Sequence, residues 1–154
     1  MGGADKNIPD IKHSISIGAE PNVVYPLVSS GQGFSKWWAS DVTQELPGGN
    51  VELGFFKRAT VYGLKPIQLV VPRKAHWLCH TGKEWGGTRL LFDLAPEGKN
   101  TLLRLTHADW QGETDYFVSC TTAWGELMFR IKAKAEATPA VCYLSPTAWL
   151  TERA

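Results

Sequence analysis

The side chains with the most obvious capacity for chemistry lie together in the stretch "HWLCH". It contains His76, Cys79 and His80, which are residue types that bind zinc. In a β-strand, His76 and His80 would point to one face and Cys79 to the other. A tetrahedral metal site needs ligands that converge, so this spacing argues against zinc. The sequence predicts neither a metal nor a cofactor.

The cysteines are the candidate nucleophiles. The chain has no G-x-S-x-G motif of the kind that presents a catalytic serine. Cys79 and Cys120 fall on the apolar faces of their expected elements, where thiols behave as inert small hydrophobes. With Cys142 they make an odd number of widely spaced cysteines, which favours free thiols in a reducing compartment. We therefore expect a cytoplasmic protein without a catalytic cysteine.

His107 is the polar residue of greatest interest. It follows Leu103 and Leu105 at intervals of two, so its side chain is expected to point inward near the end of a strand. Two interpretations are open for it. The ring could hydrogen-bond to a backbone carbonyl or a carboxylate, or it could act as an acid/base group at the end of a cavity. His13 shares the inward parity of Ile15, and the same two interpretations apply to it.

The composition argues against two classes of partner. The chain has 154 residues, the length of one ordinary domain, and its 16 Lys and Arg nearly balance its 15 Asp and Glu. A net charge of +1 supplies no basic surface for nucleic acid, and we interpret the densest basic stretch, "RIKAKAE" at 130–136, as the solvent-facing side of a helix. We also expect no secretory signal, and no stretch approaches the roughly 18 apolar residues of a membrane span.

Alternation of apolar and polar residues predicts half-buried strands over 11–17 and through 51–108. Turns rich in Gly, Pro and Asn interrupt the second region, which predicts an antiparallel meander of six strands. One face of each strand should be buried. The expected inner faces carry Val51, Leu53 and Phe55; Ile67, Leu69 and Val71; Ala75, Trp77 and Cys79; Leu90, Phe92 and Leu94; and Leu103, Leu105 and His107.

Three helices are expected around this sheet. The first falls within "AEPNVVYPLVS", residues 19–29, with Pro21 in its first turn and Pro26 bending it. The second covers "GFSKWWAS", residues 33–40. The third lies within 114–137 and has about 22 residues, which corresponds to about 33 Å at 1.5 Å per residue. Its apolar stripe has helical spacing and consists of Phe117, Cys120, Thr121, Trp124, Leu127, Met128, Ile131 and Ala135.

The adjacent indoles of Trp37 and Trp38 pose a packing question. Neighbours on a helix or strand point in different directions, so only one of the two can sit squarely in a core. We expect Trp37 to anchor the second short helix and Trp38 to face a cavity or its rim.

Several stretches together carry a resemblance to a known family. They are "FSKWWASDV", a "GG" pair before a strand, "LVVPRKAHWLC", "TRLLFDLAPEGKNTLLRLTHADW" and "TTAWGELMFRIKA". Over 11–135 the chain resembles the START-like, birch-pollen-allergen-like superfamily and, within it, relatives of the activator of heat-shock protein ninety ATPase. The resemblance implies an α+β helix-grip fold, with a curved six- to seven-stranded antiparallel sheet wrapped around a long C-terminal helix. Residues 1–138 would form this domain, and the apolar tail 139–154 would dock on it or contact a partner.

The helix-grip fold also implies a hydrophobic cavity between helix and sheet. Taken singly, an apolar residue of this kind is more often ordinary core than a ligand contact, but as a set the wall residues favour a mostly apolar pocket with a few polar points. The expected wall consists of Trp38, Phe55, Leu69, Trp77, Phe92, Leu103, Leu105, His107, Phe117, Cys120, Trp124 and Met128.

Three classes of function follow from the resemblance. The first is a non-catalytic protein that binds a small apolar or aromatic ligand in this cavity. The second is an enzyme like the cyclases and aromatases of the superfamily, with His107 as its acid/base group. The third is a module that regulates a chaperone ATPase. The partners considered are a small hydrophobic ligand and a second copy of the chain, with no nucleic acid and no membrane.

Overall fold

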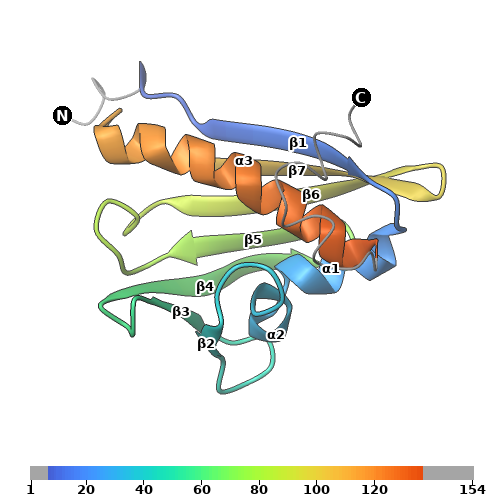
Figure 1. Cartoon of the computed structure of the whole chain (residues 1–154), viewed down its shortest axis with the longest axis horizontal. Coiled ribbons are helices and arrows are strands. Elements are labelled where there is room, and N and C mark those ends of the chain that lie inside the picture. The colour runs from blue at the N-terminus through green and yellow to red at the C-terminus, as the bar shows by residue number, and fades with distance from the viewer. Residues whose placement is uncertain (1–6, 137–154) are drawn as a thin grey trace.

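A computed structural model describes residues 7–136 of the chain, and the tail 139–154 with Cys142 lies outside this range. Seven antiparallel strands form one curved sheet in the order β1-β7-β6-β5-β4-β3-β2 (Figure 1). The strands are β1 (Ile11–Ile17), β2 (Asp41–Thr43), β3 (Val51–Phe55), β4 (Thr60–Val70), β5 (Lys74–Cys79), β6 (Arg89–Glu97) and β7 (Asn100–Ala108). The predicted α+β helix-grip architecture is confirmed.

Three helices complete the fold: α1 (Pro21–Val28), α2 (Gly31–Phe34) and α3 (Asp115–Ala135). The long α3 runs along one face of the sheet, and α1 and α2 lie beside its C-terminal half (Figure 1). Local chemistry sets the ends of α3. The Thr114 hydroxyl accepts a hydrogen bond from the Phe117 amide, and Lys132 and Lys134 lie in the last turn, near the negative end of the helix dipole. None of the helices within 7–136 is long and apolar enough to cross a membrane.

The alternation of residue types identified most of the core correctly. The inner residues expected on β5, β6 and β7 are buried, and so are Val51 and Leu53 of β3. Phe55, at the end of β3, is only half-buried. On α3 the predicted stripe is buried except for Thr121, which is exposed, and Leu127, which is half-buried. One apolar face of the sheet therefore packs under α3, as the sequence predicted.

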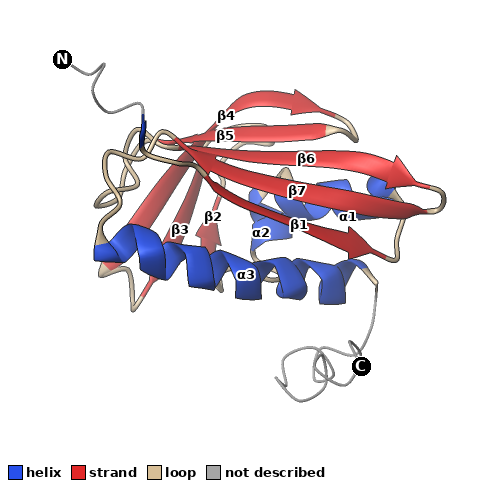
Figure 2. Ribbon diagram, turned by 90° about the horizontal axis from the view of Figure 1, so that it is seen from above, coloured by secondary structure: helices blue, strands red, loops and turns tan. Residues whose placement is uncertain are grey.

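The C-terminal half of β4 departs from the prediction. Residues 60–70 form one strand where two were predicted, so 51–108 contains five strands and not six. The register of β4 against β5 shifts between Pro66 and Gln68. The extra residue at this bulge changes which positions face inward. Ile67 is 52% and Val71 70% exposed, whereas Leu64, before the bulge, is buried. Figure 2 shows this end of β4 at the edge of the molecule opposite α3, beyond the cover of the helices.

Leu69 needs a correction as a predicted cavity residue. It pairs with the inward-facing Ala75, yet it lies at the uncovered rim and is 37% exposed. The prediction failed because it assumed that the helices cover the whole length of the inner face.

The region between α1 and β3 also differs from the prediction. The second helix is one short turn, Gly31–Phe34, so Trp37 and Trp38 lie in the turn that follows it. The three residues of β2 were not expected as a strand. Gly33 allows this compact arrangement, because a Cβ atom there would lie only 2.0 Å from the Pro26 carbonyl oxygen.

Candidate functional site

The side chains of Trp37 and Trp38 stack on one another. Their ring centroids are 5.2 Å apart and their planes differ by only 9°. The expectation that they point in different directions is wrong, because it holds for a helix or strand and these residues lie in a turn. Both are almost fully buried, with Trp37 4% and Trp38 8% exposed.

The two indoles are nevertheless held differently. The Trp37 ring nitrogen donates a hydrogen bond of 2.8 Å to the Leu27 carbonyl, which ties the turn to α1. Trp38 instead lies against Trp124 of α3, with ring centroids 5.2 Å apart. Trp37 thus anchors the turn, and Trp38 joins it to the core beneath α3.

Aromatic rings fill much of the space between α3 and the sheet. Trp124 lies against Phe92 as well as Trp38, and Phe34 packs between the indole pair and Trp77. Of the predicted wall residues, Trp38, Phe92 and His107 each contact Trp124. Six more lie in the core around this cluster: Trp77, Leu103, Leu105, Phe117, Cys120 and Met128 are buried. Phe55 is only half-buried, and Leu69 lies at the exposed rim.

His107 lies inside this core and is completely buried. The Trp124 indole N–H donates to His107 Nδ1 at 3.2 Å, so Nε2 carries the ring proton. Nε2 lies 2.9 Å from the Thr88 hydroxyl, which in turn donates to the Trp85 carbonyl at 2.6 Å. Burial lowers the pKa of His107 to about 3. Both ring nitrogens are engaged, so the neutral ring is a structural polar link.

The second inward histidine, His13, links two elements. Its Nε2 lies 3.1 Å from the Thr121 carbonyl, which connects β1 to α3. A hydrogen bond to a backbone carbonyl is the structural alternative that the sequence left open.

The residues of "HWLCH" separate as their strand parity predicted. His76 Nε2 lies 2.9 Å from an Asp93 oxygen on the outer face, and Cys79 is buried on the inner face. In the part of the chain that the structure describes, no three His, Cys, Asp or Glu side chains form a group able to hold a metal ion.

The two described cysteines are free and buried. Burial raises the pKa of the Cys79 thiol to about 12, and it also raises the pKa of Cys120. Since the thiolate is the nucleophile, neither side chain is activated for attack. Cys120 lies near a hydrogen-bonded pair of hydroxyls from Tyr62 and Tyr116, and burial raises the pKa of both phenols as well.

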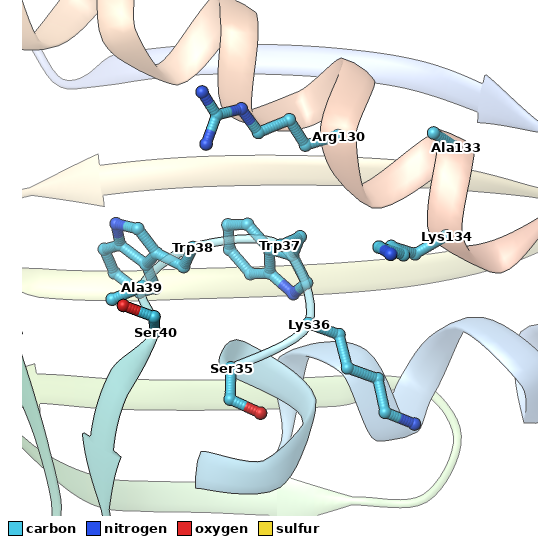
Figure 3. Close-up of a pocket in the computed structure, with 9 residues that line it drawn as sticks. All are labelled: Ser35, Lys36, Trp37, Trp38, Ala39, Ser40, Arg130, Ala133 and Lys134. Carbon is cyan, nitrogen blue, oxygen red and sulfur yellow. The ribbon is translucent and has the colours of Figure 1, made fainter. Parts of the chain in front are cut away.

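A pocket of about 250 Å³ opens beside the indole pair (Figure 3). We call it the indole pocket. It lies between the turn after α2 and the last turns of α3. Its lining consists of Ser35, Lys36, Trp37, Trp38, Ala39, Ser40, Arg130, Ala133 and Lys134.

Sequence reasoning missed most of this pocket. Of the predicted wall residues only Trp38 lines it. Arg130 and Lys134 were read as part of the wet face of the helix, although Arg130 lies one residue before the stripe position Ile131. The usable signal was the pair of adjacent tryptophans itself, because two neighbouring large apolar side chains must pack against some other element.

The pocket is positively charged on its α3 side. Arg130 Nη2 forms an ion pair of 2.8 Å with Glu126, one helical turn earlier. Its Nε is buried and has no hydrogen-bond partner among the described residues. Lys36 and Lys134 also line the pocket, and no acidic residue does.

Comparison with known proteins gives a likeness in structure only. No protein-family profile matches the sequence, and no curated protein matches it. Among solved structures, the Aha1 dimer from Colwellia psychrerythraea is similar, with a TM-score of 0.74 and 25% sequence identity, over 84% of this chain and 97% of that one.

Two further solved structures are more distant in sequence. CalU16 from Micromonospora echinospora has a TM-score of 0.67 and 16% identity, over 96% of this chain and 87% of that one. DynU16, a putative protein in the dynemicin biosynthetic locus, has a TM-score of 0.66 and 12% identity, over 85% of this chain and 49% of that one. The chain therefore has the helix-grip fold of the START-like superfamily, with an Aha1 protein among its solved neighbours, as the resemblance in its sequence predicted.

Proposed function

We propose that this protein binds a small apolar or aromatic molecule at the indole pocket. The observation that carries the proposal is the stacked pair Trp37–Trp38 in the wall of a pocket beside α3. Stacked indoles offer a flat, rigid apolar edge, and aromatic side chains commonly line small-molecule sites.

The size of the pocket limits the ligand. Small-molecule sites typically measure about 300–1,000 Å³, and this pocket of about 250 Å³ falls just below that range. A molecule with one or two rings is therefore the expected occupant. The rings between α3 and the sheet already contact one another, so we place the ligand beside the indole pair rather than deep under the helix.

Calorimetric titration with a panel of one- and two-ring aromatic molecules tests this proposal. Ser40→Phe places a ring at the exposed side of the pocket and should abolish binding. Ser119→Phe, at an exposed position of α3 outside the pocket lining, is the matched control and should bind normally. Equal binding to both variants would place the site elsewhere and contradict the proposal.

The enzyme alternative loses its candidate group. An acid/base residue must reach the substrate, but His107 is sealed in the core with both ring nitrogens engaged. Regulation of a chaperone ATPase, the third alternative, rests on the sequence resemblance alone.

We also propose that a second copy of the chain pairs with the C-terminal half of β4. β3 pairs with β4 only as far as Leu64, so the following residues have a ladder partner on the β5 side alone. Ile67, Leu69 and Val70 are exposed along this half-strand, and the exposed Val71 directly follows it. Unpaired, apolar strand edges favour strand-to-strand association. The Aha1 protein from Colwellia psychrerythraea was itself solved as a dimer.

Sedimentation velocity tests the pairing. The native chain should sediment as a dimer at micromolar concentrations, and Ile67→Lys should shift it to the monomer. Val23→Lys, which replaces an exposed valine of α1, is the control and should leave the dimer intact. A native chain that is monomeric across the concentration range would contradict this proposal.

A further inference from the structure

We infer that the occupant of the indole pocket is an aromatic acid, whose anionic group binds Arg130. This inference rests on the proposed binding function and names the chemical class of the ligand. It depends on three features of the pocket: the charges that line it, the unused donors of Arg130, and the placement of Arg130 relative to the indoles.

The lining charges all have one sign. Lys36, Arg130 and Lys134 contribute three cations, and the other six lining residues are uncharged. Neither lysine has an ion-pair partner within residues 7–136. The chain as a whole has a net charge of only +1, so this local excess does not reflect the overall composition. An anion entering the pocket would therefore be attracted, and a cation repelled.

Arg130 has hydrogen-bond donors that can bind a ligand. A guanidinium presents a planar fork of N–H groups that matches a carboxylate in two parallel hydrogen bonds. Here Nη2 contacts Glu126, and Nε is buried without a partner among the described residues. A buried polar group without a partner is unfavourable, so a ligand oxygen that engages this fork after a small side-chain rotation would relieve that cost.

The contact with Glu126 does not prevent this exchange. The Glu126 side chain is 67% and that of Arg130 37% exposed, and exposed pairs at this helical spacing are weak. The guanidinium can therefore turn toward a ligand with little loss, while Glu126 returns to solvent.

The side chain of Arg130 is better placed than that of Lys36 to share a ligand with the indoles. Figure 3 shows its side chain leaving α3 on the side where the two indoles lie, whereas the Lys36 side chain extends away from α3. The indole rings thus line one part of the pocket, and the Arg130 guanidinium lines another. A neutral hydrocarbon would cover Arg130 without satisfying it, and a small inorganic anion would leave the indole edges uncovered. A ring system with one carboxylate matches both parts.

Paired titrations with 2-naphthoate, its neutral carboxamide and acetate test the inference. We expect 2-naphthoate to bind at least tenfold more tightly than the carboxamide, and acetate to bind weakly. Arg130→Gln should bring the acid and the carboxamide to similar affinity. Arg104→Gln, at an exposed arginine of β7 outside the pocket, should retain the full preference.

The outcomes distinguish the aromatic-acid inference from the proposed binding of an apolar or aromatic molecule. If acid and carboxamide bind equally and Arg130→Gln changes neither affinity, the aromatic-acid inference is wrong and the binding function stands. If acetate binds as tightly as 2-naphthoate, the pocket is a simple anion site, which also overturns the inference. If neither naphthalene probe binds, both proposals fail together.

Discussion

The indole N–H of Trp124 on α3 donates to Nδ1 of His107 on β7. This bond fixes the ring tautomer, directs the remaining N–H to Thr88, which directly precedes β6, and connects the long helix to β7, the strand next to the edge strand β1. A polar link of this kind, buried among aromatic rings, stabilises the fold only while the histidine is neutral.

The first prediction concerns pH. Burial lowers the pKa of His107 from 6.5 to about 3. In the unfolded chain the ring protonates first as the pH falls, so the stability that the neutral ring contributes is complete above about pH 6.5 and is lost progressively toward pH 3. From this group alone, the free energy of unfolding should fall by about 2 kcal/mol between pH 7 and pH 5.

Urea denaturation at the two pH values measures this effect. His107→Gln should be less stable than the native chain at neutral pH but should lack this part of the pH dependence. His80→Gln, at an exposed histidine, is the matched control and should keep it. A native chain and a His107→Gln variant with the same pH dependence would show that His107 does not carry the effect.

The second prediction distinguishes the stacked indoles. Trp37→Phe and Trp38→Phe remove equal volumes, but only Trp37→Phe removes a hydrogen bond to the Leu27 carbonyl. A buried hydrogen bond contributes about 1 kcal/mol, so Trp37→Phe should lower the free energy of unfolding by about that much more. Equal losses in chemical denaturation would contradict the anchoring role of Trp37.

The third prediction concerns the packing of α1 against α2. Gly33→Ala would place a Cβ atom 2.0 Å from the Pro26 carbonyl oxygen, so the two helices would have to separate. We expect a loss of about 3 kcal/mol or more, at the upper end of single-substitution effects. Gly112→Ala is the control, because its Cβ would lie 3.8 Å from the nearest Thr114 atom. Thermal melting of the two variants should therefore give a large and a small shift.

The fourth prediction concerns thiol reactivity. Because burial raises the pKa of Cys79 to about 12, its thiol should resist iodoacetamide at mildly alkaline pH while the protein is folded. Peptide mass spectrometry should find Cys79 unmodified in the native protein and modified in urea. Rapid native labelling of Cys79 would show that the inner face of β5 is open to solvent.

The sequence predicted the parts of the fold that depend on regular alternation. β5, β6 and β7 pair in regular register, and the helices cover their inner face. Apolar residues on these strands therefore point inward and polar residues point outward. On β4 the bulge after Pro66 shifts the alternation of faces, and no helix covers the C-terminal half of the strand. Apolar residues such as Ile67 therefore lie at the surface.

The indole pocket was much less predictable. It joins the irregular turn at Ser35–Ser40 to residues almost a hundred positions later on α3, and no periodic pattern connects the two segments. The stacking of Trp37 on Trp38 depends on the turn conformation, which a rule for helices and strands does not describe. Arg130 was assigned to the solvent face on the basis of its charge alone, although it is adjacent to the buried stripe position Ile131.

The most direct test of binding at the indole pocket is an amide and indole N–H chemical-shift titration of the isotope-labelled protein with 2-naphthoate. Binding at this pocket predicts saturable shifts that concentrate on residues 35–40 and 130–134, including the Trp38 indole N–H, while the amides of β1 remain unchanged. Shifts centred on other parts of the chain, or none at saturating probe, would contradict it.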